Sequence, residues 1–284
     1  MTYAFFLGCT IPARLRQYEI SARAILSRLG VGVVDYREFS CCGYPLRNVD
    51  RKAFLLSAAR NLAIAERDGC DVLSLCKCGF GTLKEAQYRL RNDEDTRRDI
   101  NRILEPKGLE YRGRTQVKHL LSVLYDDVGL GVLKQHIKKA FKNLNVAAHY
   151  GCHALRPSRV TQFDDPVAPT LFDALVEVTG AESVDWSEKL SCCGAPLMGV
   201  NDRLSMNLTQ KKFRSSTEAG ADYLCTACPY CQIQFDQVRG APAGRNDGMD
   251  GPPAILYPQL LGLSMGMDKR DLGLNGNQPA MDAI

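Results

Sequence analysis

The sequence has no long hydrophobic run, which excludes a membrane-spanning helix. No segment reaches the roughly 18 apolar residues that such a helix needs. The best candidate, Ala254 to Met267, is interrupted by Pro258, Gln259 and two glycines. The first residues, MTYAFFLGCT, lack the basic stretch of a signal peptide. We therefore expect a cytoplasmic protein with no membrane span.

The sequence also lacks an excess of charge of either sign. The 284 residues include 36 basic and 32 acidic side chains, a net charge of +4, with the two signs interspersed. This balance provides no basic face for nucleic acid or for a membrane surface. Hydrophobic residues make up 45% and charged residues 24%, which is typical of a globular chain with a core and excludes whole-chain disorder. At roughly 150 residues per domain, the length allows about two domains.

Familiar catalytic and nucleotide-binding motifs are missing. The chain has only four histidines, and no Ser/His/Asp arrangement is recognisable. No Gly-x-Gly-x-x-Gly run marks a flavin or nicotinamide site, and no phosphate loop is present. Redox chemistry in this chain would therefore need electrons from a partner protein.

Cysteine, in contrast, is abundant, with twelve residues. Disulfide frameworks belong to small secreted domains, whereas cytoplasmic thiols are kept reduced. The length of the chain and the absence of a signal peptide favour the second environment. Thiolate ligands for a metal are therefore the leading interpretation, with structural thiols as an alternative.

The cysteines belong to a tandem repeat. Residues 40–46, SCCGYPL, recur at 191–197 as SCCGAPL, with six of seven positions identical. Such internal duplication predicts two similar structural units. We expect the joint within 118–145, and hence an N-terminal domain at 1–130 and a C-terminal domain at 131–284.

Further cysteines flank both copies of this motif. Upstream, Cys9 and Cys152 each follow a glycine at the end of an apolar run. Downstream, the first half has Cys76-Lys77-Cys78-Gly79 and the second has Cys228-Pro229-Tyr230-Cys231. In this repeated pattern each half has one, then two, then two cysteines, and Cys70 and Cys225 lie outside it.

Short apolar runs alternate with helical patterns in both halves, which predicts parallel α/β structure. The expected fold is α/β, with two pseudo-symmetric tandem repeats, each a short parallel sheet flanked by helices. Ligands of such sheets bind at the carboxyl ends of the strands, where the cysteine loops would lie. We expect Gly240 to Pro253 to be a mobile loop and the tail after Met267 to fray. The predicted strands are 3–7, 31–36, 72–75, 145–150, 182–185 and 222–226, and the main helices are 13–29, 50–69, 80–91, 168–180, 200–219 and 230–238.

Five thiolates per half favour iron–sulfur chemistry. A tetrahedral zinc site takes four ligands and would leave a surplus. Adjacent side chains in extended structure point apart, so a Cys-Cys pair more easily holds two irons of one cluster than a single ion. Soft thiolates also suit iron–sulfur clusters. Zinc, and disulfides or structural thiols, remain alternatives at this point.

Other residues near the motifs have plainer interpretations. Cys70 and Cys225 lie outside the repeated pattern and are expected to be buried structural thiols. His149 is expected to be a core or strand residue, and His153, next to Cys152, a structural partner. Lys77 is a candidate for a positive charge beside a cysteine loop.

The doubled pattern resembles the duplicated cysteine-rich (CCG) domain and, more narrowly, the B subunit of heterodisulfide reductase. The resemblance covers nearly the whole chain, through FFLGCTIPAR at 5–14, GFGTLKEA at 79–86, GCHALRPS at 151–158 and YPQLLGL at 257–263. It implies two noncubane [4Fe-4S] clusters, one per half, each held by five cysteines. The implied ligands are Cys9, Cys41, Cys42, Cys76 and Cys78 in the first half, and Cys152, Cys192, Cys193, Cys228 and Cys231 in the second.

The first half departs from the family pattern in one position. The family's Cys-x-x-Cys would place a cysteine at Gly79, but this chain has Cys78 instead. The first cluster would then be altered, or Cys78 would bind through a shifted loop. The departure indicates a divergent branch, similar to the heterodisulfide-reductase-like complexes of sulfur oxidation.

The resemblance also implies a function. A disulfide, or an organic persulfide, would be cleaved or formed between the two clusters by electrons that arrive singly. The implied partners are a ferredoxin protein like the C subunit of that enzyme and a flavin-containing protein like its A subunit, and the substrate can be carrier-bound. Two alternatives remain: an electron-transfer iron–sulfur subunit of a glycolate- or lactate-type oxidase, and a zinc-binding scaffold subunit.

Overall fold

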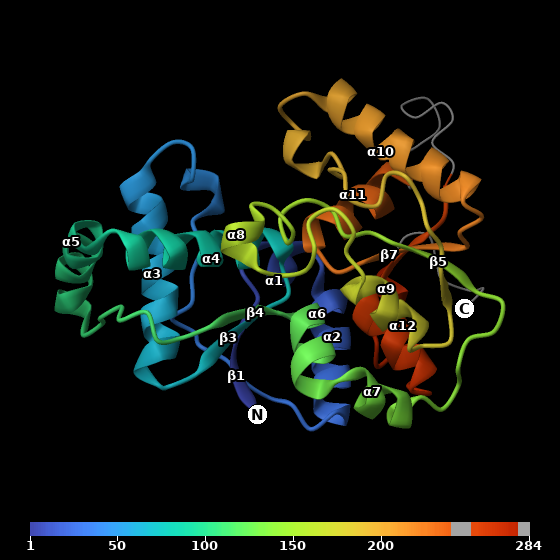
Figure 1. Ribbon diagram of the computed structural model, residues 1–284, viewed down its shortest axis with the longest axis horizontal. Helices are drawn as coiled ribbons and strands as arrows, with labels where there is room; N and C mark the ends of the chain where they lie inside the picture. Colours follow the sequence, from blue (N-terminus) through green and yellow to red (C-terminus); the bar gives the residue numbers. More distant parts are fainter. Residues whose placement is uncertain (240–250, 278–284) are drawn as a thin grey trace.

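Two four-stranded parallel sheets form the centres of two similar halves (Figure 1). The computed structural model describes residues 1–239 and 251–277. Both sheets have the same strand order, β2-β1-β3-β4 and β6-β5-β7-β8, and every pairing is parallel. This identity of order confirms the predicted fold class. The strands are β1 (Thr2–Phe6), β2 (Gly32–Val34), β3 (Asp71–Ser74), β4 (Val117–His119), β5 (Asn145–Ala148), β6 (Glu182–Ser183), β7 (Tyr223–Thr226) and β8 (Ala254–Leu256).

The central strands are buried on both faces. In β1 every residue after Thr2 is buried, and all four residues of β7 are buried. Helices cover both sides of such a sheet, so its strands are short continuous apolar runs rather than alternating ones. In register, Phe6 pairs with Ser74 at the end of β1 and β3. The chain therefore leaves both strands at the same edge of the sheet.

Helices fill the space around each sheet. The first half contains α1 (Thr10–Arg14), α2 (Arg16–Arg28), α3 (Arg51–Arg67), α4 (Lys77–Asn92) and α5 (Glu94–Leu104). The second contains α8 (Ser158–Thr161), α9 (Leu171–Glu177), α10 (Asp202–Glu218), α11 (Pro229–Arg239) and α12 (Tyr257–Ser264). Between the halves lie α6 (Leu120–Ser122), the π-helical turn η3 (Val123–Val128) and α7 (Leu130–His136). Short 3-10 turns are η1 (Tyr44–Leu46), η2 (Glu105–Lys107), η4 (Ala195–Leu197) and η5 (Leu274–Gly276).

The duplication extends to the helix caps. The side chain of Asp50 accepts the Ala53 N–H at the start of α3, and Asn201 accepts the Leu204 N–H at the start of α10. Both side chains satisfy a backbone donor that has no partner within the helix. These two equivalent helices begin at the same distance along the chain from their Cys-Cys pairs, and they pack against the cysteine loops.

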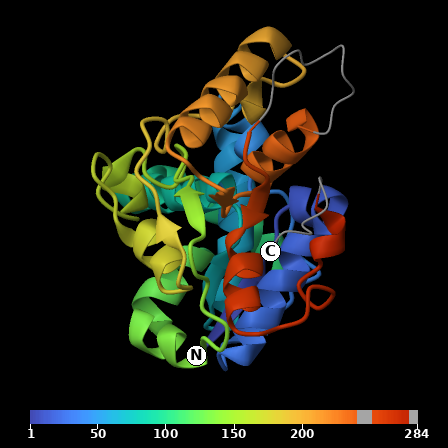
Figure 2. The ribbon, with the colours of Figure 1, turned by 90° about the vertical axis from the view of Figure 1, so that its right-hand side faces the viewer.

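The two halves are interlocked. The red α12 of the second half packs along the blue α2 of the first, as the view in Figure 2 shows. Helix α1 likewise contacts α11 across the joint. A single hydrophobic cluster includes Phe5 and Tyr18 from the first half together with Ile255 and Leu261 from the second. This shared core holds the cysteine loops of the two halves against each other.

Several expected boundaries differ in detail. Strand β2 spans three residues of the predicted 31–36, and β6 only two of 182–185. Strands β4 and β8 were not predicted, because three-residue strands give no periodic signal. Helix 13–29 is two helices that meet at Leu15. Most of the predicted loop Gly240 to Pro253, residues 240–250, lies outside the described residues.

The expectation that the chain frays after Met267 is wrong for 268–277. Leu272 and Leu274 are buried in the shared core. The Asn277 side-chain amide donates to Gln259 Oε1 at 2.9 Å, and Gln259 returns a bond of the same length. The sparse apolar content of the tail concealed two leucines that dock onto α2 and α12.

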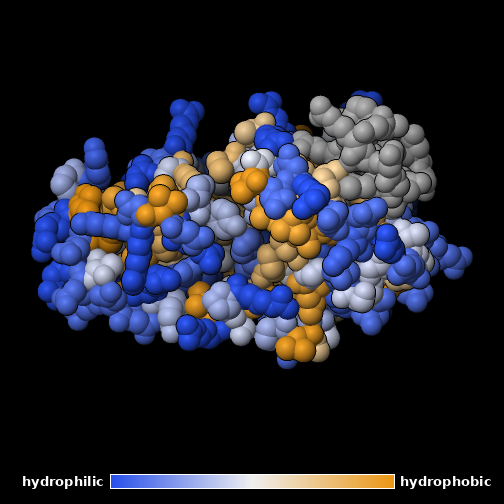
Figure 3. Space-filling view, turned by 90° about the horizontal axis from the view of Figure 1, so that it is seen from above, coloured by the Kyte–Doolittle hydropathy of each residue, from blue (hydrophilic) through white to orange (hydrophobic). Residues whose placement is uncertain are grey.

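The face of the molecule shown in Figure 3 is mainly hydrophilic, with apolar groups gathered in patches between charged ones. Val49 and Val200, at equivalent positions after the two Cys-Cys pairs, are 83% and 82% exposed. Within the described ranges, no helix combines the length and apolar character needed to cross a membrane. The apolar segment 254–267 instead forms β8 and α12 in the core.

Candidate metal centre

The ten predicted cysteines come together at the carboxyl ends of the strands, in two adjoining cavities. All twelve cysteines of the chain carry free thiols, so none is consumed in a disulfide. We call the first cavity, together with its cysteines Cys9, Cys41, Cys42 and Cys76, the first site. The second site contains Cys152, Cys192, Cys193, Cys228 and Cys231.

Glycine after each Cys-Cys pair is required by the backbone. Gly43 and Gly194 have φ values of 91° and 93°, in the left-handed region that other residues avoid. A Cβ on Gly43 would also lie 2.8 Å from the Phe54 carbonyl oxygen. In this turn the Gly43 N–H donates to Cys41 Sγ at 3.4 Å, and the Gly194 N–H donates to Cys192 Sγ at the same distance. The turn therefore directs backbone donors at the first thiol of each pair.

The second-site thiols form a connected set. Cys192 is hydrogen-bonded to Cys152 and Cys193, and Cys231 is bonded to Cys193 and Cys228. Hydrogen bonds from neighbouring thiols hold the pKa of Cys192 and the pKa of Cys228 well below the usual thiol range. Metals bind the thiolate form. Hydrogen bonds within the same set raise the pKa of Cys152, Cys193 and Cys231, so the arrangement favours the thiolate at Cys192 and Cys228.

The two sites share a wall. The Sγ atoms of Cys76, Cys78 and Cys228 lie within 4.8 Å of one another. Behind this wall, His119 is neutral because burial lowers its pKa to about 3. His119 Nε2 lies 3.3 Å from the Leu75 carbonyl oxygen and 3.1 Å from that of Ala227, and Nδ1 accepts the Leu121 N–H. One imidazole thus connects the residues that precede the cysteine clusters of both halves.

Cys78 lies between the sites and lines both cavities. Helix α4 begins at Lys77, earlier than predicted, so Cys78 is in its first turn and matches Tyr230 of α11. Its sulfur lies 3.1 Å from His153 Nδ1. Gly79 takes the position of Cys231, where a Cβ would meet Ser74 Oγ at 3.4 Å, an ordinary contact. Four cysteines of the first site therefore occupy positions equivalent to those of the second site. The fifth, Cys78, is displaced by one residue along helix α4.

His149 is a site residue that the sequence interpretation missed. It is fully buried, and neither ring nitrogen has a hydrogen-bond partner. One of its nitrogens lies within 4.8 Å of the thiols of Cys193 and Cys231. The available signal was positional: His149 stands three residues before Cys152, where the first half has Phe6 before Cys9.

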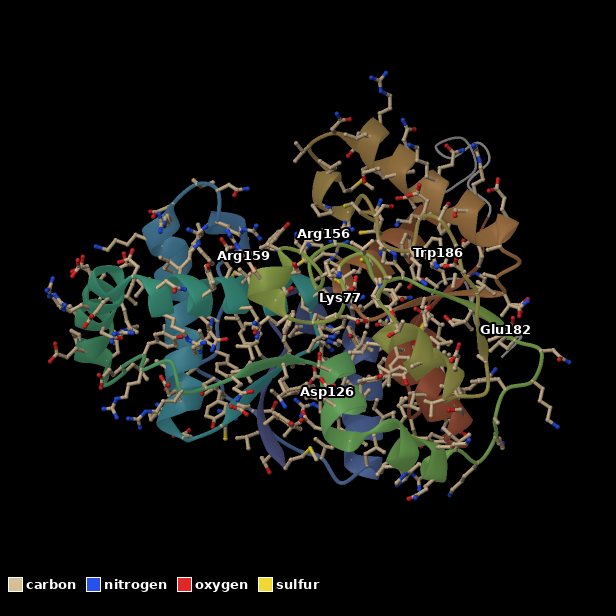
Figure 4. All side chains as sticks on the ribbon, viewed as in Figure 1. Lys77, Asp126, Arg156, Arg159, Glu182 and Trp186 are labelled. Carbon is tan, nitrogen blue, oxygen red and sulfur yellow. The ribbon has the colours of Figure 1, made fainter. Side chains whose placement is uncertain are left out.

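Two buried lysines also approach the second site. Lys77, in the middle of the molecule where the halves meet (Figure 4), donates to the carbonyl oxygens of His149 and Tyr150, both at 2.9 Å. Lys212 donates to Ser191 O at 2.8 Å and to the Glu188 carbonyl. Burial lowers the pKa of Lys212 to about 8, while nearby thiolates act in the opposite direction. Lys77 lines the second cavity, and burial lowers the pKa of its side chain while nearby thiolates act in the opposite direction.

Of the other residues near the motifs, Cys70, Cys225 and Trp186 have structural places, whereas His153 lines the second cavity. Cys225 is fully buried on β7, as expected, whereas the expectation that Cys70 is buried is wrong: Cys70 is half-buried, 3.8 Å from the Tyr36 hydroxyl. Neither residue lines the first or the second cavity. Trp186 donates to the Ala148 carbonyl at 3.2 Å. His153 contacts both Cys78 and Tyr44, with its Nε2 3.4 Å from the Tyr44 hydroxyl.

The residues present fit an iron–sulfur group. The donors are almost entirely soft thiols, which iron–sulfur clusters prefer. Each site holds more thiols than one tetrahedral zinc ion would use, once Cys78 is counted with the first. The unpartnered nitrogens of His149 indicate that a further polar or metal-bound group belongs beside Cys193 and Cys231.

Comparison with known proteins agrees with this arrangement. The cysteine-rich domain family designated CCG matches residues 3–84 and 146–236. The chain is 36% identical over 279 residues to the B subunit of the ferredoxin/F(420)H(2)-dependent CoB-CoM heterodisulfide reductase of Methanosarcina acetivorans, covering 96% of this chain and 92% of that protein. It is 33% identical over 276 residues to the 8-methylmenaquinol:fumarate reductase membrane anchor subunit of Wolinella succinogenes, covering 97% and 96% of the two chains.

A solved structure shares the fold. A hypothetical protein from Helicobacter pylori superposes with a TM-score of 0.78 at 19% identity, over all of this chain and 53% of that one. The present chain thus spans about half of that structure, and the likeness concerns the fold alone. With both halves matched and relatives similar over nearly their full length, the chain belongs to the cysteine-rich (CCG) domain family and, within it, to the iron–sulfur proteins like the B subunit of heterodisulfide reductase.

Proposed function

We propose that this chain is the iron–sulfur subunit of a heterodisulfide-reductase-like complex that cleaves or forms a disulfide or an organic persulfide. The observation that carries the proposal is the convergence of two thiol sets, one from each half, at a shared wall formed by Cys76, Cys78 and Cys228. The family membership supports an oxidoreductase subunit rather than a scaffold.

The ten cysteines would hold two noncubane [4Fe-4S] clusters, five thiolates to each. When bound, such clusters supply single electrons and iron atoms that can bind sulfur. The chain itself positions the thiolates: Gly43 and Gly194 fix the turns, and His119 fixes the wall. Cys78 is proposed as the fifth ligand of the first site, displaced by one position from the place of Gly79.

The reaction requires two electrons and two protons for each disulfide: RSSR′ + 2 e⁻ + 2 H⁺ gives RSH and R′SH. Two one-electron centres that adjoin within one chain can hold both electrons close to a single S–S bond. Because the sequence has no flavin or nicotinamide motif, the electrons must be exchanged with partners. We propose a ferredoxin protein of the C-subunit type and a flavin-containing protein of the A-subunit type, in the cytoplasm, with a substrate that can be carrier-bound.

The displaced Cys78 supports a place in the sulfur-oxidation branch of these complexes. There the chain would run in the oxidative direction, releasing the two electrons to its partners. A second candidate function is electron transfer to a flavoprotein, favoured by the similarity to the Wolinella fumarate reductase subunit. The same role in a glycolate- or lactate-type oxidase belongs to this second candidate.

A single-turnover assay separates these functions. Protein purified without oxygen is reduced with dithionite, freed of excess reductant and mixed with 2-hydroxyethyl disulfide. The proposal predicts about one disulfide cleaved for every two electrons stored, with the released thiols counted by a colorimetric reagent. Cys193→Ser should abolish the release, and Cys70→Ser, outside both sites, should leave it unchanged. Oxidation of the protein by a quinone analogue with no thiol release from the disulfide would favour the second candidate.

A further inference from the structure

The two sites are built alike but are surrounded by different residues. Three positions next to each site can be matched directly by their spacing from the cysteines or by equivalent helices. In the first site they are Phe6, Asn61 and Pro229. In the second they are His149, Lys212 and Lys77. At each of the three matched positions, the first site has an uncharged residue and the second site has a more polar or a cationic one.

The pair formed by Asn61 and Lys212 shows the substitution most clearly. Both residues lie at the same position of the equivalent helices α3 and α10. The amide of Asn61 donates to the Cys41 carbonyl at 3.0 Å. In the second site the ammonium of Lys212 donates to the Ser191 carbonyl, whose peptide continues into Cys192. The same structural task is thus performed once by a neutral group and once by a cation.

The third position is filled from the opposite half. Pro229 follows Cys228 but lines the first site, and Lys77 follows Cys76 but lines the second. The Lys77 ammonium is held by the carbonyls of His149 and Tyr150, which shortly precede Cys152. Among the charged side chains whose burial is described, in residues 1–236 and 251–277, three are buried: these two lysines and Asp236. Asp236 is bonded to Gln232 on its own helix.

We propose that the second site has the higher reduction potential, so that an electron entering the chain comes to rest there first. The inference depends on the proposed function, because it concerns the clusters that the two sites would hold. Reduction adds negative charge, and buried cations beside the site stabilise that charge strongly where water is excluded. Hydrogen bonds to cluster sulfurs act in the same direction. The unpartnered His149 nitrogens lie beside Cys193 and Cys231 of the second site, while His153 contacts Cys78 of the first site at 3.1 Å, so the two buried lysines make the difference between the sites.

The test exchanges residues between the halves. Lys212→Asn gives the second site the residue of the first, and Asn61→Lys makes the reverse change. Lys211→Asn removes an exposed lysine from the adjacent position of the same helix and is the matched control. Redox titrations of protein purified without oxygen are followed by electron paramagnetic resonance. The signals are assigned with Cys42→Ser and Cys193→Ser, which remove one site each.

Lys212→Asn should disfavour one-electron reduction of the second site at least tenfold, about 59 mV for one electron. Asn61→Lys should raise the potential of the first site, and Lys211→Asn should change neither. If Lys212→Asn does not retain its iron, Lys212→Arg, which keeps the charge, and His149→Phe provide the comparison: the first should leave the potential unchanged and the second should lower it.

Two results would overturn the inference while leaving the proposed function intact. One is a first-site potential equal to or above that of the second in the unmodified protein. The other is a second-site potential that does not respond to Lys212→Asn or to His149→Phe while the iron content is retained. Absence of iron and sulfide from the unmodified protein would instead remove the proposed function and this inference together.

Discussion

Moving the fifth thiol of the first site tests how closely the two halves correspond. Cys78→Ala removes the displaced cysteine, and Gly79→Cys in the same chain places a cysteine where the second half has Cys231. If Cys78 is a ligand, Cys78→Ala should lower the first-site iron. The double variant should restore it, because it recreates the Cys-x-x-Cys spacing of Cys228 and Cys231.

The structure indicates that both changes are tolerated. A Cβ on Gly79 would lie 3.4 Å from Ser74 Oγ, 3.5 Å from Cys76 Cβ and 3.6 Å from a Phe6 ring carbon, all ordinary contacts. Gly79 is inside helix α4, where glycine is about 1 kcal/mol less favourable than alanine and cysteine somewhat less so. We therefore expect Gly79→Cys to change the free energy of unfolding by no more than about 0.5 kcal/mol. Removal of the buried Cys78 sulfur should cost about 1 kcal/mol.

The assay measures the iron and acid-labile sulfide per chain after anaerobic purification. The electron paramagnetic resonance spectrum of the first site is recorded on the same samples. Unmodified protein should contain roughly eight irons and Cys78→Ala roughly half of them, with a return toward eight in the double variant. Cys70→Ala serves as the control, because Cys70 lines neither cavity. Full iron and an unaltered spectrum in Cys78→Ala would refute the assignment of Cys78 as a ligand.

Three further predictions concern the sites and their support. Cys42→Ser and Cys193→Ser should each remove roughly half of the iron while the other site keeps its spectrum, and loss of all iron from either variant would show that the sites do not load independently. Leu272→Ala should lower the free energy of unfolding by about 2–4 kcal/mol, measured by urea denaturation, because this fully buried side chain anchors the tail to the shared core; an unchanged midpoint would mean that the tail contributes nothing. The pKa of His119 is lowered to about 3 in the folded state from an ordinary value of 6.5, so between these values the unfolded chain binds the extra proton and stability falls as the pH is lowered. His119→Gln should therefore lose less stability than the unmodified protein when the pH is reduced from 7 to 5, and equal losses would contradict the buried neutral state.

The overall fold could be predicted because its signals are local and occur twice. The recurring SCCG turn and the alternating apolar runs predicted two parallel sheets with cysteine loops at one edge. The three-residue strands β4 and β8 could not be found this way, since their pairing partners β3 and β7 lie far from them in the sequence. Docking of Leu272 onto the core likewise depends on contacts between the first and last parts of the chain.

The cysteine sets followed from spacing, but their surroundings did not. Lys212 lies inside a long helix, with nothing in its local sequence to indicate that it reaches Ser191. Lys77 bonds to the opposite half, a contact created only when the halves interlock. His149 could have been noticed by aligning the two halves at Cys9 and Cys152, where it replaces Phe6.

The central claim is that a duplicated scaffold brings two sets of thiolates together around iron and sulfide. Diffraction from anaerobically grown crystals, recorded at the iron absorption edge, tests it most directly. We predict two groups of iron atoms, one bonded to Cys152, Cys192, Cys193, Cys228 and Cys231 and the other to Cys9, Cys41, Cys42, Cys76 and Cys78. A signal only at the zinc edge, or sulfur–sulfur bonds between these cysteines, would contradict it.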